Sequence, residues 1–329
     1  MLLFPYLERF DRNMALFGYT KRSDRKAQNA IVAFRQSYFE YRPYVGFSPV
    51  PGFRPMPTRT KKAFRVFFVG GSAMEISAAR SVMDVQERLT QMRCNVEVIN
   101  AGRSAYVSGQ EVVMTLMELL PLHPDLVIVF DGYNDISRVE EGEAPGSPEY
   151  TRAMEASFTA GMSAYQALLN DVAQRSFLVQ LLKVGRSGQP FVSAGESQVF
   201  EDAVEIYGSN IEKMARLAAA NKYGLIVAIQ PVLFFKDHLG SSEAKLIAAN
   251  PERAQVYQHY FPQLIERARA ITGNEGVSFR DLSQVFEGVS GDVFIDGVHF
   301  DGENAAVREI LRAKFENMIL SYPGACAGR

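Results

Sequence analysis

The sequence predicts an α/β fold built around a parallel sheet, and two patterns together with the composition support this prediction. Short apolar runs at 64–69, 96–99 and 126–130 are typical of strands that are buried on both faces. Amphipathic segments with helical spacing lie between these runs. The 329 residues are 47% apolar and 22% charged, which is ample for a large core. Strands that alternate with helices form right-handed βαβ units, so we expect the strands to be parallel.

The predicted elements follow one another in a regular order. The first strand, 64–69, ends at a pair of glycines, and an amphipathic helix follows it. A helix over 109–120 ends at Pro121, because proline cannot continue a helix. The later expected elements are helices within 149–182 and 201–220, strands at 225–229 and 277–279, and a last helix over 304–320. The last helix carries its apolar residues on one stripe, which predicts packing against the sheet.

The length corresponds to two domains at about 150 residues each, but the elements indicate one split domain. We expect residues 63–139 and 223–322 to form that domain. Residues 140–222 contain a Gly/Pro/Glu loop, helices and a Gly/Ser-rich stretch, so we expect a helical insertion that is a candidate lid. Residues 1–62 are proline-rich between 43 and 57, and we expect an N-terminal extension packed on the core.

The charge balance and the apolar pattern exclude several classes of protein. Thirty-five basic and 37 acidic residues give a net charge of −2, which argues against a nucleic-acid partner. There is no run of about 18 apolar residues, so no membrane span is expected. Residues 1–10 lack the basic start and apolar stretch of a secretory signal. The literal expectation is therefore a cytoplasmic protein, with association with the cell envelope left open.

Cysteine and histidine are scarce. Cys94 and Cys326 are too few for a disulfide framework or a four-thiolate zinc site. We do not expect them to form a bridge, because Cys94 lies in a segment that looks buried and Cys326 in a Gly/Ala-rich tail. The four histidines, none at metal-ligand spacing, are His123, His238, His259 and His299. We therefore expect neither a metal nor a cofactor.

Short polar motifs follow the predicted strands. They are Gly70–Ala73, Asn100–Gly102, Asp131–Asp135 and, near the end of the sheet, Asp296–His299. Each motif alone has an ordinary interpretation as a tight turn or a helix cap. Ligands in open parallel sheets gather beyond the carboxyl ends of the strands, so we expect these motifs to meet at one edge.

Together the motifs predict nucleophilic catalysis. A serine hydroxyl attacks only when an adjacent base takes its proton, and Ser72 is the candidate nucleophile. His299 is the candidate base. Asp296 lies three residues earlier, so it can accept the Nδ1 hydrogen of His299 and stabilise the imidazolium.

Attack on an ester carbonyl also requires donors for the oxyanion. We expect these to be the backbone N–H groups of Ser72 and Gly102 and the side-chain amide of Asn134, with glycine at 102 letting the backbone approach the substrate. Tyr133 and His238 are candidate substrate contacts. Tyr133 also fits an ordinary core position, and His238 the rim of the cleft.

The order Gly-Gly-Ser, Asn-Ala-Gly, Gly-x-Asn-Asp and Asp-x-x-His resembles the SGNH hydrolases, also called GDSL esterases and lipases. The four name-giving positions match Ser72, Gly102, Asn134 and His299, with Asp296 as the third triad member. The resemblance implies a flavodoxin-like three-layer α/β/α sandwich with a five-stranded parallel sheet. It also implies ester hydrolysis by a serine nucleophile without a cofactor.

The first motif departs from Gly-Asp-Ser-Leu and resembles the Gly-Gly-Ser form of many bacterial, carbohydrate-directed members. The expected function is hydrolysis of small acyl esters, most plausibly acetyl on a carbohydrate or polysaccharide, through an acyl-enzyme on Ser72. The alternatives are a polysaccharide O-acetyltransferase that uses the same acyl-enzyme and a catalytically silent carbohydrate-binding protein. Nucleotide binding is not expected, because residues 70–72 match neither Gly-x-Gly-x-x-Gly nor a Walker loop. The expected partner is an acyl ester or acylated glycan, and the sequence predicts no oligomeric state.

Overall fold

The computed structural model describes residues 63–148, 151, 197–271 and 277–326, together with the backbone of two short strands. These are β1 (Phe39–Arg42) and β2 (Gly46–Pro49), which pair antiparallel. The expected packing of residues 1–62 on the core, and most of the expected insertion, lie outside the described residues.

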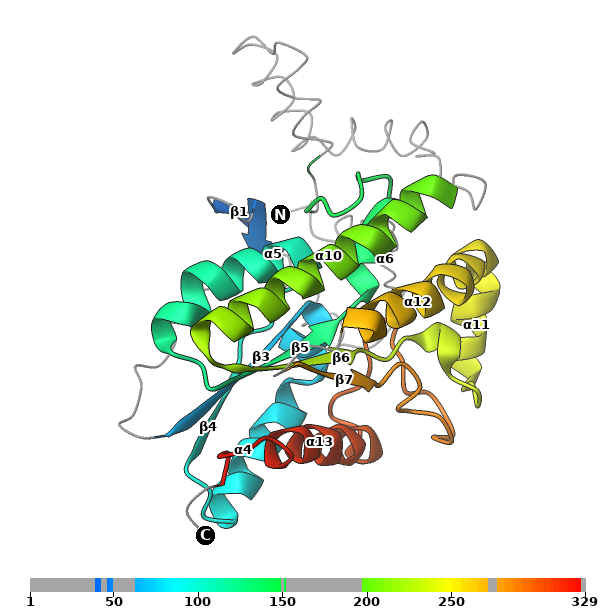
Figure 1. Ribbon diagram of the computed structural model, residues 1–329. Helices are drawn as coiled ribbons and strands as arrows, with labels where there is room; N and C mark the ends of the chain where they lie inside the picture. The colour runs from blue at the N-terminus through cyan, green and yellow to red at the C-terminus, as the bar shows by residue number, and fades with distance from the viewer. Residues whose placement is uncertain are drawn as a thin grey trace, which may run out of the picture.

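A five-stranded parallel sheet forms the centre of the molecule (Figure 1). Its strands, in spatial order, are β4 (Val96–Asn100), β3 (Phe64–Gly70), β5 (Leu126–Asp131), β6 (Gly224–Ile229) and β7 (Val277–Asp281). In chain order this is 2-1-3-4-5, the order of flavodoxin-like sheets. The parallel α/β prediction is therefore confirmed.

The strand sequences explain their places in the sheet. All six residues of β5 and of β6 are buried, because these strands have neighbours on both sides and helices over both faces. β7 lies at an edge, and its last residues, Arg280 and Asp281, are exposed. In the register, Gly70 pairs with Phe130, and Phe68 pairs with Asn100. The carboxyl ends of β3, β4 and β5 are thus brought to one edge.

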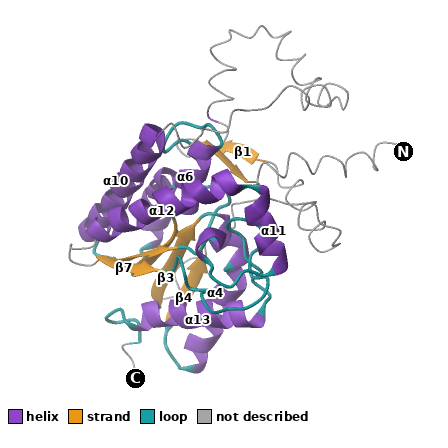
Figure 2. Cartoon of the chain, turned by 90° about the vertical axis from the view of Figure 1, so that its right-hand side faces the viewer, coloured by secondary structure: helices purple, strands orange, loops and turns teal. Residues whose placement is uncertain are grey.

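Helices cover both faces of the sheet, as Figures 1 and 2 show. One layer holds α4 (Ala79–Gln91) and α13 (Ala305–Leu320). The other holds α5 (Ser108–Met114), α6 (Tyr133–Glu140), α10 (Ser197–Asn221) and α12 (Pro251–Ile271), with α11 (Ser241–Ala249) beside α12. Short helical turns are η3 (Ala73–Ser77), η4 (Thr115–Leu119), η5 (Leu120–Leu122) and η6 (Leu233–Phe235). None of the helices in the described ranges is long and apolar enough to cross a membrane.

The last helix packs as its sequence predicts. The side chain of Asn304 caps α13 by accepting from the N–H groups of Ala306 at 3.0 Å and Val307 at 3.4 Å. Phe315 is fully buried, and its ring centroid lies 4.7 Å from that of Phe68 and 5.4 Å from that of Phe130. Truncating such a side chain to alanine costs about 3–5 kcal/mol, so this contact holds α13 firmly on the sheet.

Helix α10 lies within residues 140–222, which the sequence suggested to be an insertion. In the structure it is the crossover helix that leads into β6, and it packs on α5, α6 and α12. Tyr207 of α10 is fully buried, and its hydroxyl donates to Asp131 Oδ1 at 2.7 Å. The core domain therefore includes α10, and the range left for an insertion is shorter than expected.

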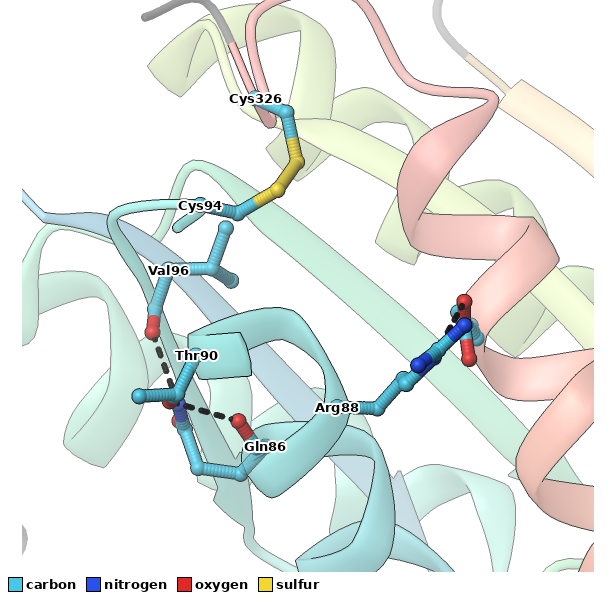
Figure 3. The surroundings of a disulfide bond; sticks show 7 residues. Gln86, Arg88, Thr90, Cys94, Val96 and Cys326 are labelled. Atoms are coloured by element: carbon cyan, nitrogen blue, oxygen red, sulfur yellow. Dashed lines mark hydrogen bonds and ion pairs between the residues drawn. A yellow bond between two sulfur atoms is a disulfide. The ribbon is translucent and has the colours of Figure 1, made fainter. Parts of the chain in front are cut away.

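Cys94 and Cys326 form a disulfide, so the expectation that they stay unbridged is wrong (Figure 3). Their Cα atoms lie 4.9 Å apart although 232 positions separate them in the sequence. The bridge forms because α4 and α13 cover the same face of the sheet. The turn after α4 and the tail after α13 therefore reach the same place.

Candidate active site

The turn after β3 presents Ser72 beyond the end of the strand. The carbonyl of Gly71 accepts from the N–H groups of Met74 at 3.1 Å and Glu75 at 3.0 Å, which starts the wide turn η3 immediately after Ser72. A Cβ on residue 71 would lie 2.5 Å from Asn134 Nδ2, so only glycine allows this close approach. The Gly-Gly-Ser form thus reflects tight packing around the serine.

Three predicted residues form one hydrogen-bonded chain. His299 Nε2 lies 2.6 Å from Ser72 Oγ, and His299 Nδ1 lies 2.7 Å from Asp296 Oδ2. Ser72 and His299 are 227 positions apart in the sequence. They meet because the Asp296–His299 loop and the β3 turn lie at the same edge of the sheet.

Asp296 is almost completely buried and fully hydrogen-bonded. Its Oδ1 accepts from the backbone N–H groups of Val298 at 2.8 Å and His299 at 2.7 Å, which leaves Oδ2 for the imidazole. The loop is closed by the backbone bond from Ile295 N–H to the His299 carbonyl at 2.7 Å. These contacts orient the carboxylate before any substrate arrives.

The carboxylate also changes the basicity of the histidine. Burial lowers the pKa of His299, but the charge and hydrogen bond of Asp296 raise it by more, so its pKa lies above that of an ordinary histidine. The side chain of His299 is 11% exposed, against 1% for Asp296. The imidazole can therefore exchange protons with solvent, whereas the carboxylate is shielded from water.

Asn134 lies where the sequence predicts, beside the serine. It is the second residue of α6, and its Nδ2 donates to the Tyr106 carbonyl at 2.7 Å. The same nitrogen is next to Gly71. An amide nitrogen carries two hydrogens, so the second N–H remains available as a donor.

Gly102 does not fit its predicted role as an oxyanion donor. Its N–H donates to Asn100 Oδ1 at 2.9 Å, within its own turn. A Cβ at this position would lie 2.6 Å from the backbone nitrogen of Glu75. Glycine is therefore required because the loop packs against η3, and substrate approach is not needed to explain it.

Ala105 is a candidate donor that the sequence did not suggest. It has a positive φ of 65°, which is uncommon for a residue other than glycine. In the described part of the chain, no group accepts a hydrogen bond from the backbone N–H of Ala105 or from that of Ser72. The other N–H groups of the loop are all bonded: Gly102 to Asn100, Arg103 to Gly70, Ser104 to Glu75 and Tyr106 to Arg103. Alanine gives no warning of a positive φ, so only the structure could identify this position.

Tyr133, expected as a substrate contact, is a buried core residue, the other interpretation that the sequence allowed. It is 6% exposed, and its ring stacks on that of Tyr257 with centroids 4.8 Å apart. Its hydroxyl lies 3.0 Å from where a Cβ on Gly297 would be, so it packs against the Asp296–His299 loop. Burial raises the pKa of Tyr133 to about 12, which keeps it neutral there.

His238, the second expected substrate contact, lies on the surface. Its side chain is 68% exposed, and its Nε2 is 3.3 Å from Asp237 Oδ2. Within the described ranges no contact joins His238 to Ser72 or His299. Its role in substrate binding stays a prediction.

Three buried acidic residues, Glu111, Asp131 and Asp135, lie close together near the starts of α5 and α6. Asp135 accepts from Ser108 Oγ at 2.6 Å and from Ser108 N–H at 3.1 Å, which joins the start of α5 to the start of α6. Burial and the neighbouring Asp131 raise the pKa of Asp135 to about 7. Burial and the charge of the neighbouring Asp131 also raise the pKa of Glu111. Within the ranges the structure describes, no group of three or more His, Cys, Asp or Glu residues is arranged to hold a metal ion.

The fold is similar to solved structures of several ester hydrolases. A GDSL-like lipase from Bacteroides thetaiotaomicron is 18% identical over 80% of this chain and 91% of that chain, with a TM-score of 0.44. An acetylxylan esterase from Geobacillus stearothermophilus is 14% identical over 78% and 95% of the two chains, with a TM-score of 0.47. A lipase/acylhydrolase from Enterococcus faecalis is 16% identical over 78% and 94%, with a TM-score of 0.44.

No family model and no curated protein matches the sequence.

Proposed function

We propose that this protein is a serine hydrolase of carboxylic esters that works through an acyl-enzyme on Ser72. The observation that carries the proposal is the chain from Asp296 to His299 to Ser72, with distances of 2.7 Å and 2.6 Å. An acid, a base and a hydroxyl in this order form the arrangement that activates a serine in unrelated hydrolases. A binding protein would gain nothing from burying such a chain.

In the first half of the reaction, Ser72 Oγ attacks the ester carbonyl while His299 Nε2 takes the hydroxyl proton. Asp296 stabilises the imidazolium that forms and keeps Nδ1 protonated. When the tetrahedral intermediate collapses, His299 returns the proton to the leaving alkoxide, and the alcohol departs. In the second half, His299 takes a proton from water, the water oxygen attacks the acyl carbonyl, and Ser72 leaves with the proton.

The oxyanion donors of this mechanism are the N–H groups of Ser72 and Ala105 and the second N–H of Asn134. Support comes from their common position around the β3 turn and from the lack of another acceptor for the two backbone groups within the described ranges. Each such donor is worth about 3–4 kcal/mol of transition-state stabilisation. In this proposal Ala105 takes the role first expected of Gly102, because the N–H of Gly102 is already bonded to Asn100.

The proposed substrate is an acylated glycan, with acetyl as the acyl group. This rests on the likeness of Gly70-Gly71-Ser72 to the carbohydrate-directed form of the motif. The split domain 63–139 and 223–322, with α10 added to it, would carry the chemistry.

The disulfide suggests where the protein works. Bridges such as Cys94–Cys326 persist in oxidising compartments and are rare in the reducing cytoplasm. Of the two compartments considered from the sequence, the cell envelope therefore fits better than the cytoplasm.

Ser72→Ala tests the mechanism directly. The variant should fold normally and lose hydrolysis of p-nitrophenyl acetate, and it should not be labelled by a fluorophosphonate probe that labels the native protein. Ser290→Ala removes an exposed serine and should behave like the native protein in both assays. Undiminished turnover by Ser72→Ala would refute the assignment.

A further inference from the structure

Arg103 is a buried arginine that has no acidic partner in the described ranges, and its loop is bonded to the turn that carries the proposed nucleophile. The residue is 5% exposed. Its Nη1 donates to the Gly102 carbonyl at 3.2 Å, whereas Nε and Nη2 have no hydrogen-bond partner. Within the described ranges it forms no ion pair.

The other buried arginines of the described residues are paired. Arg65 Nε lies 2.7 Å from Glu97, and Arg138 Nη1 lies 2.6 Å from Glu141. A guanidinium cannot give up its proton at any ordinary pH. Burying its charge without a counter-charge is therefore unfavourable. Glu97 and Glu141 supply the counter-charges of Arg65 and Arg138, and no carboxylate of the described ranges does so for Arg103.

The loop that carries Arg103 is fastened to the nucleophile turn on both sides of Ser72. The N–H of Arg103 donates to the Gly70 carbonyl at 2.8 Å, two residues before the serine. The next residue, Ser104, donates from its N–H at 2.6 Å to Glu75, three residues after the serine. The carboxylate of Glu75, the acidic residue of this turn, thus accepts from Ser104 and forms no ion pair with Arg103.

The unpaired atoms of Arg103 indicate what would bind there. Nε–H and the adjacent Nη2–H lie on the same side of the planar guanidinium and form two parallel donors. This edge matches the two oxygens of a carboxylate. Within the described ranges, the hydrogen bonding of the side chain is limited to the 3.2 Å bond to Gly102. Side chains at binding sites commonly change rotamer when a ligand arrives.

We propose that Arg103 binds a carboxylate on the alcohol part of the substrate, so that the preferred substrate is an acylated acidic glycan that contains a uronic acid. The inference rests on the proposed esterase function and gives it a substrate class. Arg103 is then the residue that distinguishes acidic from neutral glycan esters.

The test compares two substrates that differ in one group, mono-O-acetylated methyl glucuronoside and mono-O-acetylated methyl glucoside. A charge-assisted pair of hydrogen bonds predicts that the native protein prefers the uronoside by about 10- to 100-fold in kcat/KM. Arg103→Met should reduce this ratio to near one, and Arg103→Lys should keep part of it. Arg280→Met is the matched control, because Arg280 is exposed and donates to the carbonyl of its own preceding residue in the same way. Its ratio should equal the native one.

Thermal unfolding gives a second measurement that does not depend on turnover. Removing an uncompensated buried charge should raise the Tm of Arg103→Met above that of the native protein. Methyl glucuronoside should raise the Tm of the native protein but not that of Arg103→Met. A lower Tm for Arg103→Met, with no effect of the uronoside on the native Tm, would show a purely structural arginine and overturn the proposal.

The two hypotheses can fail separately. Native protein that hydrolyses p-nitrophenyl acetate but treats both glycosides equally would overturn the role of Arg103 and keep the esterase. Native protein that hydrolyses no ester, yet gains an Arg103-dependent rise in Tm from methyl glucuronoside, would overturn the esterase and keep the carboxylate site.

Discussion

Replacement of Asp296 by asparagine tests the electrostatic part of the site with little change in shape. The carboxylate makes three contacts, two from Oδ1 to backbone N–H groups and one from Oδ2 to His299 Nδ1. The amide oxygen of asparagine can keep the two backbone contacts, so we expect the loop to fold as before. The amide nitrogen must then face Nδ1 and donate to it.

This reversal places the imidazole in the wrong tautomer. When Nδ1 accepts, the hydrogen lies on Nε2, and Nε2 can no longer take the proton of Ser72. Loss of the correct tautomer in such a triad costs about 10⁴-fold in kcat. That factor corresponds to about 5 kcal/mol of transition-state stabilisation.

The assay is hydrolysis of p-nitrophenyl acetate by Asp296→Asn between pH 5 and 9, with unfolding curves to confirm the fold. Asp301→Asn is the control, because Asp301 is an exposed carboxylate close by in the sequence. Its Oδ1 accepts from the backbone N–H of Glu303. The control variant should retain native activity. If Asp296→Asn is well folded and keeps activity within tenfold of the native protein, the reasoning about the triad is refuted.

Three further predictions concern pH and stability. Activity should rise with pH through the raised pKa of His299, because only the neutral imidazole acts as a base; a pH–rate profile that stays high below pH 5 would contradict this. Cys326→Ser should lower stability by about 3–5 kcal/mol in denaturant titrations, since the bridge to Cys94 closes 232 positions of sequence. It should leave kcat/KM of the folded protein unchanged, because the bridge lies at the opposite ends of the strands. The pKa of Glu111 is raised in the fold. The contribution of its neutral carboxyl group to the free energy of unfolding is therefore present below pH 4, and it is lost as the pH rises through the pKa of the folded protein. Glu111→Gln should therefore reduce the fall in Tm between pH 5 and pH 8, and an unchanged fall would contradict the buried-acid interpretation.

The meeting of Ser72, His299 and Asp296 could be predicted from the sequence, because Ser72 directly follows a strand and the other two residues belong to one short loop. Ser72 follows a glycine pair after an apolar run, and Asp296 lies three residues before His299. Local sequence is enough to place Ser72 at the edge of the parallel sheet and to place Asp296 beside His299. The contacts among them then follow from the strand order.

The oxyanion donors could not be predicted in the same way. Gly102 looks like a donor because glycine commonly marks a close approach, but the approach is to Glu75. Ala105 gives no signal, since its positive φ is imposed by the contacts of neighbouring residues and not by its own side chain. Backbone donors have no sequence signature, because every residue except proline has an N–H.

By itself the sequence determined the parallel α/β sheet, its strands, the amphipathic last helix and the identity of the serine, histidine and aspartate. These follow from local apolar patterns and from residue chemistry. Only the tertiary structure decided that Cys94 and Cys326 meet, that α10 belongs to the core, that Tyr133 is buried and that Arg103 has no acidic partner. The physical reason is that pairing and burial are properties of two or more segments in contact. Which distant segments meet is decided by how the helices pack on the sheet.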